Sequence, residues 1–130
     1  MIAVDTNVLV RALVDDPGQA AQVRAARAVL QKAGEVFVSQ VVLVETVWVL
    51  ETAYGLKRDD IVMVLDTLAL NSAYVIEHEH RFIEARALFR REKADFADFI
   101  ILTAAQNENS PLFTFDKRLA GSSGVKLITL

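Results

Sequence analysis

Short apolar stretches alternate along the chain with longer segments in which apolar residues recur every three or four positions. Short apolar runs bounded by polar residues are typical of buried strands, whereas longer periodic segments are typical of helices. The pattern predicts strands over residues 1–5, 35–39, 73–77, 111–115 and 125–130. It predicts helices over residues 7–14, 17–33, 40–54, 58–70, 81–93 and 95–109, with a short helical turn from Lys117.

The ends of two predicted helices carry residues that helix ends favour. Pro17 suits a first turn and Gly34 follows a last turn. Ser39 is the expected N-cap of the helix that Gly55 is expected to close. Strands alternating with helices indicate parallel βαβ units. We therefore expect an α/β fold, a three-layer α/β/α sandwich with a central, mostly parallel five-stranded sheet, in one domain over residues 1–130.

Composition narrows the class of protein. The chain is 53% hydrophobic and 24% charged, which fits a compact globular domain, and it has no cysteine for disulfides or Cys-ligated zinc. Its longest apolar run, residues 41–50, contains Glu45 and is too short to span a membrane. We expect a soluble, cytoplasmic protein without a membrane partner. The net charge is −3, but residues 81–93 and 117–126 are locally basic, which permits a polyanionic ligand without requiring one.

Four acids occupy positions where an open α/β fold builds its ligand site. Asp5 and Asp116 each follow a predicted strand, and Glu45 and Asp98 lie early in helices predicted to leave the same edge of the sheet. Clustered carboxylates repel one another, so an oxygen-seeking divalent cation would be needed to hold them together. Mg²⁺ suits such a pocket, and Mn²⁺ can substitute for it.

Glu45 is the acid that fits its surroundings least. Its predicted helix is apolar nearly all round, so we expect the helix and Glu45 to be buried. An unpaired carboxylate there would cost several kcal/mol, roughly, unless it is neutralised, paired or bound to a cation. An ion pair with an arginine of another element is the structural alternative to a metal.

The other acids have structural alternatives as helix caps. Asp5 and Asp116 can each cap the helix that follows them. Asp95 is the expected N-cap of its helix, and Asp98 then lies at the third helical position, where an acid favours the helix dipole. It is less probable that four caps or ion pairs converge on one edge of the sheet by chance than that the four acids form one acidic pocket.

Four segments together resemble a known family: MIAVDTNVLV, VSQVVLVETVWVL, FADFIILTAAQ and LFTFDKRL. In order and spacing they resemble the PIN-domain nucleases, specifically the VapC-type toxins of type II toxin–antitoxin systems. The resemblance implies a Mg²⁺- or Mn²⁺-dependent endoribonuclease that hydrolyses RNA with a metal-activated water. It assigns the metal-binding and catalytic roles to Asp5, Glu45, Asp98 and Asp116, with Thr6 and Asn7 orienting the first acid through hydrogen bonds.

The resemblance also implies partners. Members are typically homodimers held inactive by a cognate antitoxin protein that covers the acidic groove. The alternative function is a PIN-like module without catalysis, which binds metal for structure or acts as a protein-interaction scaffold. Two other α/β classes are disfavoured, because a haloacid-dehalogenase-like phosphatase needs an acid where Asn7 stands and a receiver domain needs an Asp where Glu77 stands.

The histidines and the large aromatic residues fit structural roles better than functional ones. His78 and His80 could reach a metal, but their spacing of two positions at a predicted strand-to-helix connection favours an exposed loop. The helical spacing of the large aromatic residues favours core or dimer packing over base stacking; they are Trp48, Phe82, Phe89, Phe96 and Phe99. The apolarity of residues 40–54 and 61–70 suggests a dimer or antitoxin surface.

Overall fold

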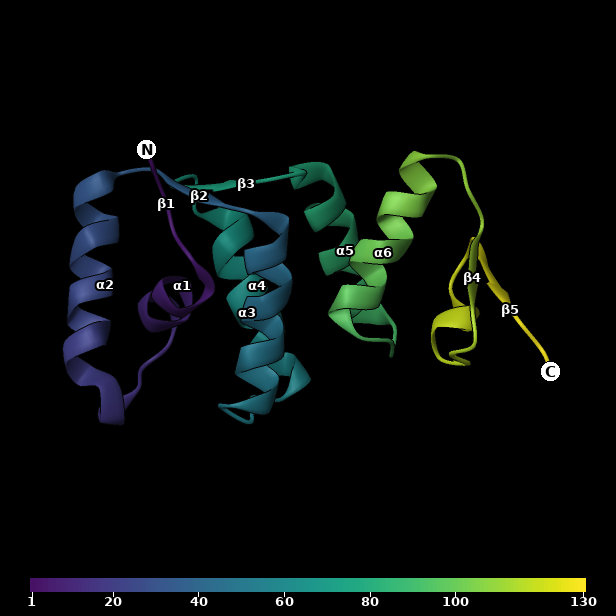
Figure 1. Cartoon of the computed structure of the whole chain (residues 1–130), viewed down its shortest axis with the longest axis horizontal. Coiled ribbons are helices and arrows are strands. Elements are labelled where there is room, and N and C mark those ends of the chain that lie inside the picture. Colours follow the sequence, from purple (N-terminus) through teal and green to yellow (C-terminus); the bar gives the residue numbers. More distant parts are fainter. The chain divides into compact units, whose positions relative to one another are not determined.

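The computed structural model describes all 130 residues, which form two compact units, Met1–His78 and Glu79–Leu130. Figure 1 follows the elements of both units along the chain. No helix is long and apolar enough to cross a membrane.

The first unit combines a small parallel sheet with four α-helices. Its strands lie in the order β1-β2-β3, with Ile2 opposite Val36 and Val38 opposite Ile76. The elements, in chain order, are β1 (Ile2–Ala3), α1 (Thr6–Leu13), the 3₁₀ turn η1 (Pro17–Gln19), α2 (Ala20–Ala33), β2 (Val36–Val38), α3 (Gln40–Thr52), α4 (Arg58–Leu70) and β3 (Tyr74–Ile76).

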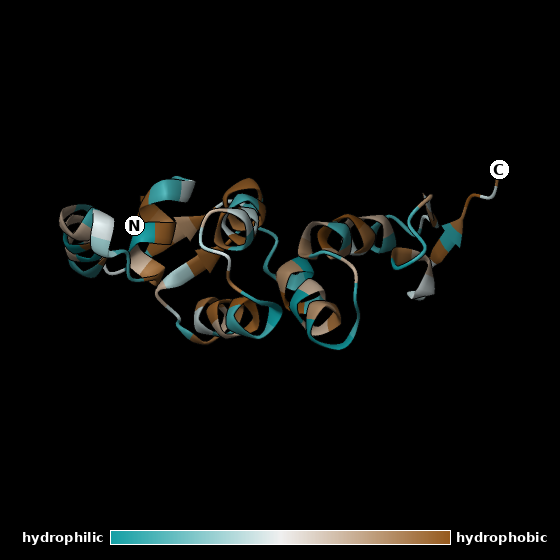
Figure 2. Ribbon diagram, turned by 90° about the horizontal axis from the view of Figure 1, so that it is seen from below, coloured by the Kyte–Doolittle hydropathy of each residue, from teal (hydrophilic) through white to brown (hydrophobic).

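The core of the first unit lies between its helices and its strands. Helix α1 packs against α2 and α3, and α3 packs against α4. Each fully buried aliphatic side chain contributes roughly 1.5–3 kcal/mol. In Figure 2 the strands of this unit are mostly brown, whereas α2 alternates between brown and teal, as an amphipathic helix should. The buried side chains include Leu9, Val10, Leu43, Leu50, Ile61, Leu65 and Leu68.

The second unit pairs two helices with a two-stranded parallel sheet. Helix α5 packs against α6, and the rings of Phe89 and Phe96 meet edge to face, with centroids 5.8 Å apart. Strand β4 pairs with β5, and Leu112 lies opposite Val125. The elements are α5 (Glu79–Arg91), α6 (Phe96–Asn107), β4 (Leu112–Thr114), the 3₁₀ turn η2 (Leu119–Gly121) and β5 (Val125–Leu127).

Each predicted strand and helix has a counterpart in the structure, with shorter strands. Ser39 is the N-cap of α3 and accepts a hydrogen bond from the Val42 N–H. Gly34 ends α2 with a φ of 78°, a left-handed conformation that glycine adopts without steric strain. Helix α3 ends at Thr52, so Gly55 lies in the following loop rather than at the helix end.

The predicted single five-stranded sheet is wrong for this structure. The five strands form two sheets, β1-β2-β3 and β4-β5. Apolar patterns predict that a segment is a strand, but strands of two or three residues carry too little pattern to specify which edges pair. Asp5 and Asp116 therefore follow strands of different sheets, so no single sheet edge brings the acids together.

The aromatic residues divide into buried and exposed sets. Trp48 is 64% exposed on α3, so it does not belong to the core. Beside it, Val41 is 68% exposed, and the buried face of α3 is limited to Leu43, Thr46, Val47 and Leu50. The prediction of a helix buried all round is thus wrong. The prediction of core packing holds for Phe82, Phe89, Phe96 and Phe99, which are all buried.

Candidate active site

Asp5 stands at the junction of β1 and α1. It is the N-cap of α1, and its Oδ1 accepts a hydrogen bond of 3.0 Å from the Val8 N–H. This bond satisfies one of the backbone donors that a helix start leaves unpaired. It also fixes the direction of an otherwise exposed carboxylate, whose second oxygen, Oδ2, takes no part in the cap.

The Thr6 hydroxyl bonds to the second of the four acids, Glu45. Its Oγ1 donates to Glu45 Oε1 over 3.1 Å, although the two residues are 39 positions apart. The hydroxyl thus orients Glu45, whereas the sequence interpretation has Thr6 orient Asp5. Glu45 is exposed, which corrects the expectation that it is buried, because it lies on the open face of α3 with Val41 and Trp48.

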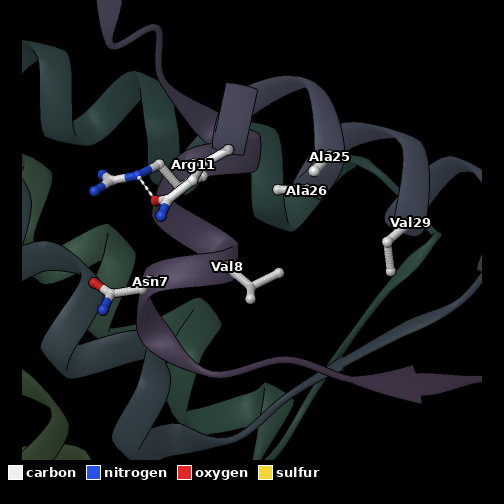
Figure 3. Close-up of a pocket in the computed structure, with 7 residues that line it drawn as sticks. Asn7, Val8, Arg11, Ala25, Ala26 and Val29 are labelled. Carbon is white, nitrogen blue, oxygen red and sulfur yellow. Dashed lines mark hydrogen bonds between the residues drawn. The ribbon is translucent and has the colours of Figure 1, made fainter. Parts of the chain in front are cut away.

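Asn7 borders a pocket between α1 and α2 rather than the Asp5 cap. Figure 3 shows Asn7, Val8 and Arg11 of α1 along one side and Ala25, Ala26 and Val29 of α2 along the other. The pocket holds about 340 Å³. Its lining is mainly apolar, and the dashed bond runs from Arg11 Nε to Gln22 Oε1, at 3.0 Å.

Arg11 also anchors a polar network at the end of α1. Its Nη1 donates to the Tyr54 hydroxyl, which in turn donates to Asp16 Oδ2 over 2.8 Å. Arg11 Nη1 lies 3.5 Å from the same carboxylate oxygen. Burial, followed by the bond to Asp16, raises the pKa of Tyr54 above its ordinary value. The network ties α1 to the loop before α2 and to the end of α3.

Asp98 is the third residue of α6, behind the N-cap Asp95, as the sequence predicts. Burial raises the pKa of Asp98 above its ordinary value, and the charges of Asp95 and Asp116 raise it further. The Asp95 backbone N–H and the charge of Arg118 act in the opposite direction. Asp98 is therefore a half-buried carboxylate beside two others, an arrangement that a cation would stabilise.

Asp116 is held by the turn that follows β4. Its Oδ1 accepts from the N–H groups of Arg118, at 2.8 Å, and Leu119, at 3.4 Å. The first of these bonds is the main cause of a pKa below the ordinary value, and the Arg118 side chain lowers the pKa further. Asp116 therefore stays ionised under conditions in which Asp98 holds its proton more readily.

The histidine segment contributes other contacts. His78 is an exposed loop residue with a φ of 51°, and Glu77 accepts a hydrogen bond from the Gln40 N–H at 3.0 Å. His80 is exposed but lies in the first turn of α5, where its Nε2 is 3.0 Å from Glu84 Oε1.

The chemistry of the acids fits a divalent cation. Within neither unit do three or more Asp, Glu or His side chains gather closely enough to hold a metal ion. In the second unit the charge of Asp116 acts on Asp98, and in the first unit Glu45 bonds to Thr6, the residue that follows Asp5. Mg²⁺ is commonly bound through one or two carboxylates, with water completing its shell, so oxygen donors in pairs suit it.

The sequence model of one protein family, described as the PIN domain, matches residues 2–122, nearly the whole chain. The chain belongs to the PIN-domain family. No curated protein matches it. PIN domains are generally metal-dependent nuclease modules, and nucleases are hydrolases. The match runs through both compact units and includes all four candidate acids.

Two arginines of this PIN domain were not assigned a role from the sequence. Arg118 lies 3.5 Å from Asp116 and 3.8 Å from Asp95, and Arg11 organises the network around Tyr54. The sequence does contain a signal for the contact between Arg118 and Asp116. Arg118 lies two residues after Asp116, and a turn after a strand brings such neighbours together. Nothing local in the sequence pairs Arg11 with Tyr54, which is 43 residues away.

Proposed function

We propose that this PIN domain is a divalent-metal-dependent endoribonuclease that acts as the toxin of a toxin–antitoxin pair in the cytoplasm. The metal-binding and catalytic residues are Asp5, Glu45, Asp98 and Asp116, and the ion is Mg²⁺ or Mn²⁺. The observation that carries the proposal is the state of Asp98 in a chain of this family. Burial, and then the charges of Asp95 and Asp116, raise the pKa of this half-buried carboxylate, and a bound cation would offset the cost of ionising it.

Three of the four acids are oriented by contacts within their own unit. The Val8 N–H orients Asp5, and Thr6 orients Glu45. Two backbone N–H groups hold Asp116 in its ionised form. A bound divalent cation supplies an activated water and offsets the charge of the phosphodiester. The products carry a 5′-phosphate and a 3′-hydroxyl, by analogy with the VapC-type toxins that the sequence resembles.

The test compares cleavage of a mixed RNA pool by the wild-type chain and two acid-to-amide variants. Asp5→Asn keeps the N-cap, since Asn caps as well as Asp, but removes a ligand charge. Asp59→Asn is the matched control, because Asp59 is an exposed acid in the first turn of α4. Cleavage that needs Mg²⁺ or Mn²⁺, stops in EDTA, and is lost in Asp5→Asn alone supports the proposal.

The rival function is a PIN-like scaffold without catalysis. Metal binding by the wild-type chain, together with no cleavage of any RNA in the pool, would favour that reading. Cleavage that persists in EDTA, or that Asp5→Asn leaves intact, would contradict the assignment of the acids.

The toxin role and a homodimeric state are parts of the same proposal. They are supported by the resemblance of the sequence and by exposed apolar side chains of the first unit, including Val41, Trp48, Met63 and Leu70. Light scattering after size-exclusion chromatography tests the dimer. Growth arrest on expression, relieved by co-expression of an adjoining small gene, tests the toxin role, and normal growth with an active nuclease would contradict it.

A further inference from the structure

Arg118 faces two carboxylates of the second unit. Its Nη2 lies 3.5 Å from Asp116 Oδ2 and 3.8 Å from Asp95 Oδ2. The side chain is 55% exposed, so both ion pairs are weak and exchange readily with solvent. Arg118 thus supplies positive charge to a group of acids that has an excess of negative charge, without being fixed there.

The same side chain borders a cleft of about 240 Å³. Lys93 adds a second positive charge to the lining, and the Glu92 carboxylate in the lining accepts a hydrogen bond from the Ser122 hydroxyl. Gly121 leaves the floor open, because a Cβ built there would meet no atom within 4 Å. The cleft lining thus combines two cationic side chains with one carboxylate, and the cleft has space for an oxyanion.

We propose that Arg118 exchanges partners in the course of the reaction. In the structure it pairs with Asp95 and Asp116. Where Asp116 binds a divalent cation, the Arg118 side chain would instead hold a phosphate of the RNA at the cleft that it lines with Lys93. This inference rests on the proposed nuclease function and names a substrate-contacting residue for it.

Three physical arguments support the exchange. A divalent cation carries twice the charge of a guanidinium and repels it, so the two compete for the same carboxylates. The guanidinium cannot lose its proton, and its planar fork matches phosphate oxygens. The Arg118 backbone N–H continues to hold Asp116 Oδ1 at 2.8 Å, so the side chain can leave without releasing the acid.

The experiment measures metal affinity and RNA binding separately from cleavage. Calorimetric titration with Mg²⁺ compares the wild-type chain with Arg118→Gln, Arg118→Lys and the charge-matched control Lys126→Gln, whose lysine lies in β5 and does not line the cleft. Fluorescence anisotropy follows binding of a labelled phosphorothioate RNA pool, in Mg²⁺ and in EDTA, across a range of salt concentrations. The sulfur-substituted backbone keeps its charge and slows Mg²⁺-assisted hydrolysis, because soft sulfur binds Mg²⁺ poorly.

Arg118→Gln is expected to bind Mg²⁺ about twofold to fivefold more tightly, the range typical of an exposed ion pair. In Mg²⁺, the slope of the logarithm of its RNA affinity against the logarithm of the salt concentration should become shallower by about 0.7, which corresponds to the loss of one phosphate contact. In EDTA the slope should not change. Arg118→Lys should restore both values, and Lys126→Gln should change neither.

Unchanged Mg²⁺ affinity in Arg118→Gln, or an equal loss of slope with and without metal, would overturn the exchange and leave the proposed nuclease function intact. Failure of the wild-type chain to bind Mg²⁺ at all would overturn both. Thermal unfolding of each variant confirms that the folded chain is compared.

Discussion

Thr6 offers a direct test of how the first two acids are organised. Thr6→Val removes the hydroxyl that donates to Glu45 Oε1 and keeps the shape of the side chain. A hydrogen bond to a charged group contributes about 1.5–3 kcal/mol when buried, but Glu45 is exposed and water can replace the donor, so we expect about 0.5–1.5 kcal/mol. The value of kcat/KM should therefore fall about twofold to tenfold.

The fold should tolerate this change. Val and Thr have similar helix propensities, and Thr6 is the first residue of α1. We expect the midpoint of thermal unfolding to move by no more than about 2 °C. Thr6→Ser is the matched control, because it keeps the hydroxyl and should retain most of the activity on the RNA pool in Mg²⁺.

A double-mutant cycle isolates the pair. If Thr6 acts only through Glu45, then Thr6→Val should have no further effect in a Glu45→Gln background, where residual activity is measured with Mn²⁺ at high enzyme concentration. Equal activity of Thr6→Val and wild type would refute the role of the hydrogen bond. So would additive losses in the cycle, since they would mean that Thr6 acts independently of Glu45.

Three further predictions follow from local contacts. Asp98→Asn should abolish cleavage yet unfold at the same or a slightly higher temperature than wild type at pH 7 without metal. Burial and the neighbouring charges raise the Asp98 pKa in the folded state, so ionised Asp98 lowers the stability of the wild-type fold. This loss of stability is absent below pH 3.8, the ordinary pKa, and is complete above the raised pKa. The difference in stability between the two chains should therefore vanish in acid, and Mg²⁺ should stabilise only the wild type. Tyr54→Phe should lower the free energy of unfolding by about 1 kcal/mol, seen by urea denaturation, and no loss would show that Arg11 and Asp16 are satisfied without the hydroxyl. Gly34→Ala should cost about 1 kcal/mol by the same measurement, because the φ of 78° disfavours a side chain although no atom lies within 4 Å, and an unchanged midpoint would mean that the turn relaxes.

The local structure was predictable because its signals are local. The Ser39 hydroxyl bonds to an N–H three residues away, and the segment 58–70 matches α4 residue for residue. Asp95 and Asp98 likewise occupy the cap and first-turn positions that their spacing indicates. In each case the interaction lies within about one helical turn, where the sequence order fixes the neighbours.

Longer-range features were less predictable. Pairing of two strands depends on atoms far apart in the chain, and strands as short as Ile2–Ala3 give little pattern from which to infer their partners. The burial of α3 was overestimated for a related reason. Val41 and Trp48 are apolar but exposed, and apolarity alone does not reveal whether a helix face meets its own chain or remains open.

The structural and functional interpretations of the acids are not exclusive. Asp5 caps α1 through Oδ1, and Asp116 binds backbone N–H groups through Oδ1. Such bonds fix the direction of a carboxylate, and those to Asp116 also lower its pKa; both properties suit a metal ligand. A capping role inferred from sequence is therefore weak evidence against catalysis. What distinguishes a ligand is a carboxylate placed at a cost, and in the second unit Asp98 alone has a pKa raised by burial and like charge. Replacing Asp98 by Asn separates the two roles. Loss of a residue needed only for folding would reduce stability, whereas loss of a metal ligand would reduce activity alone.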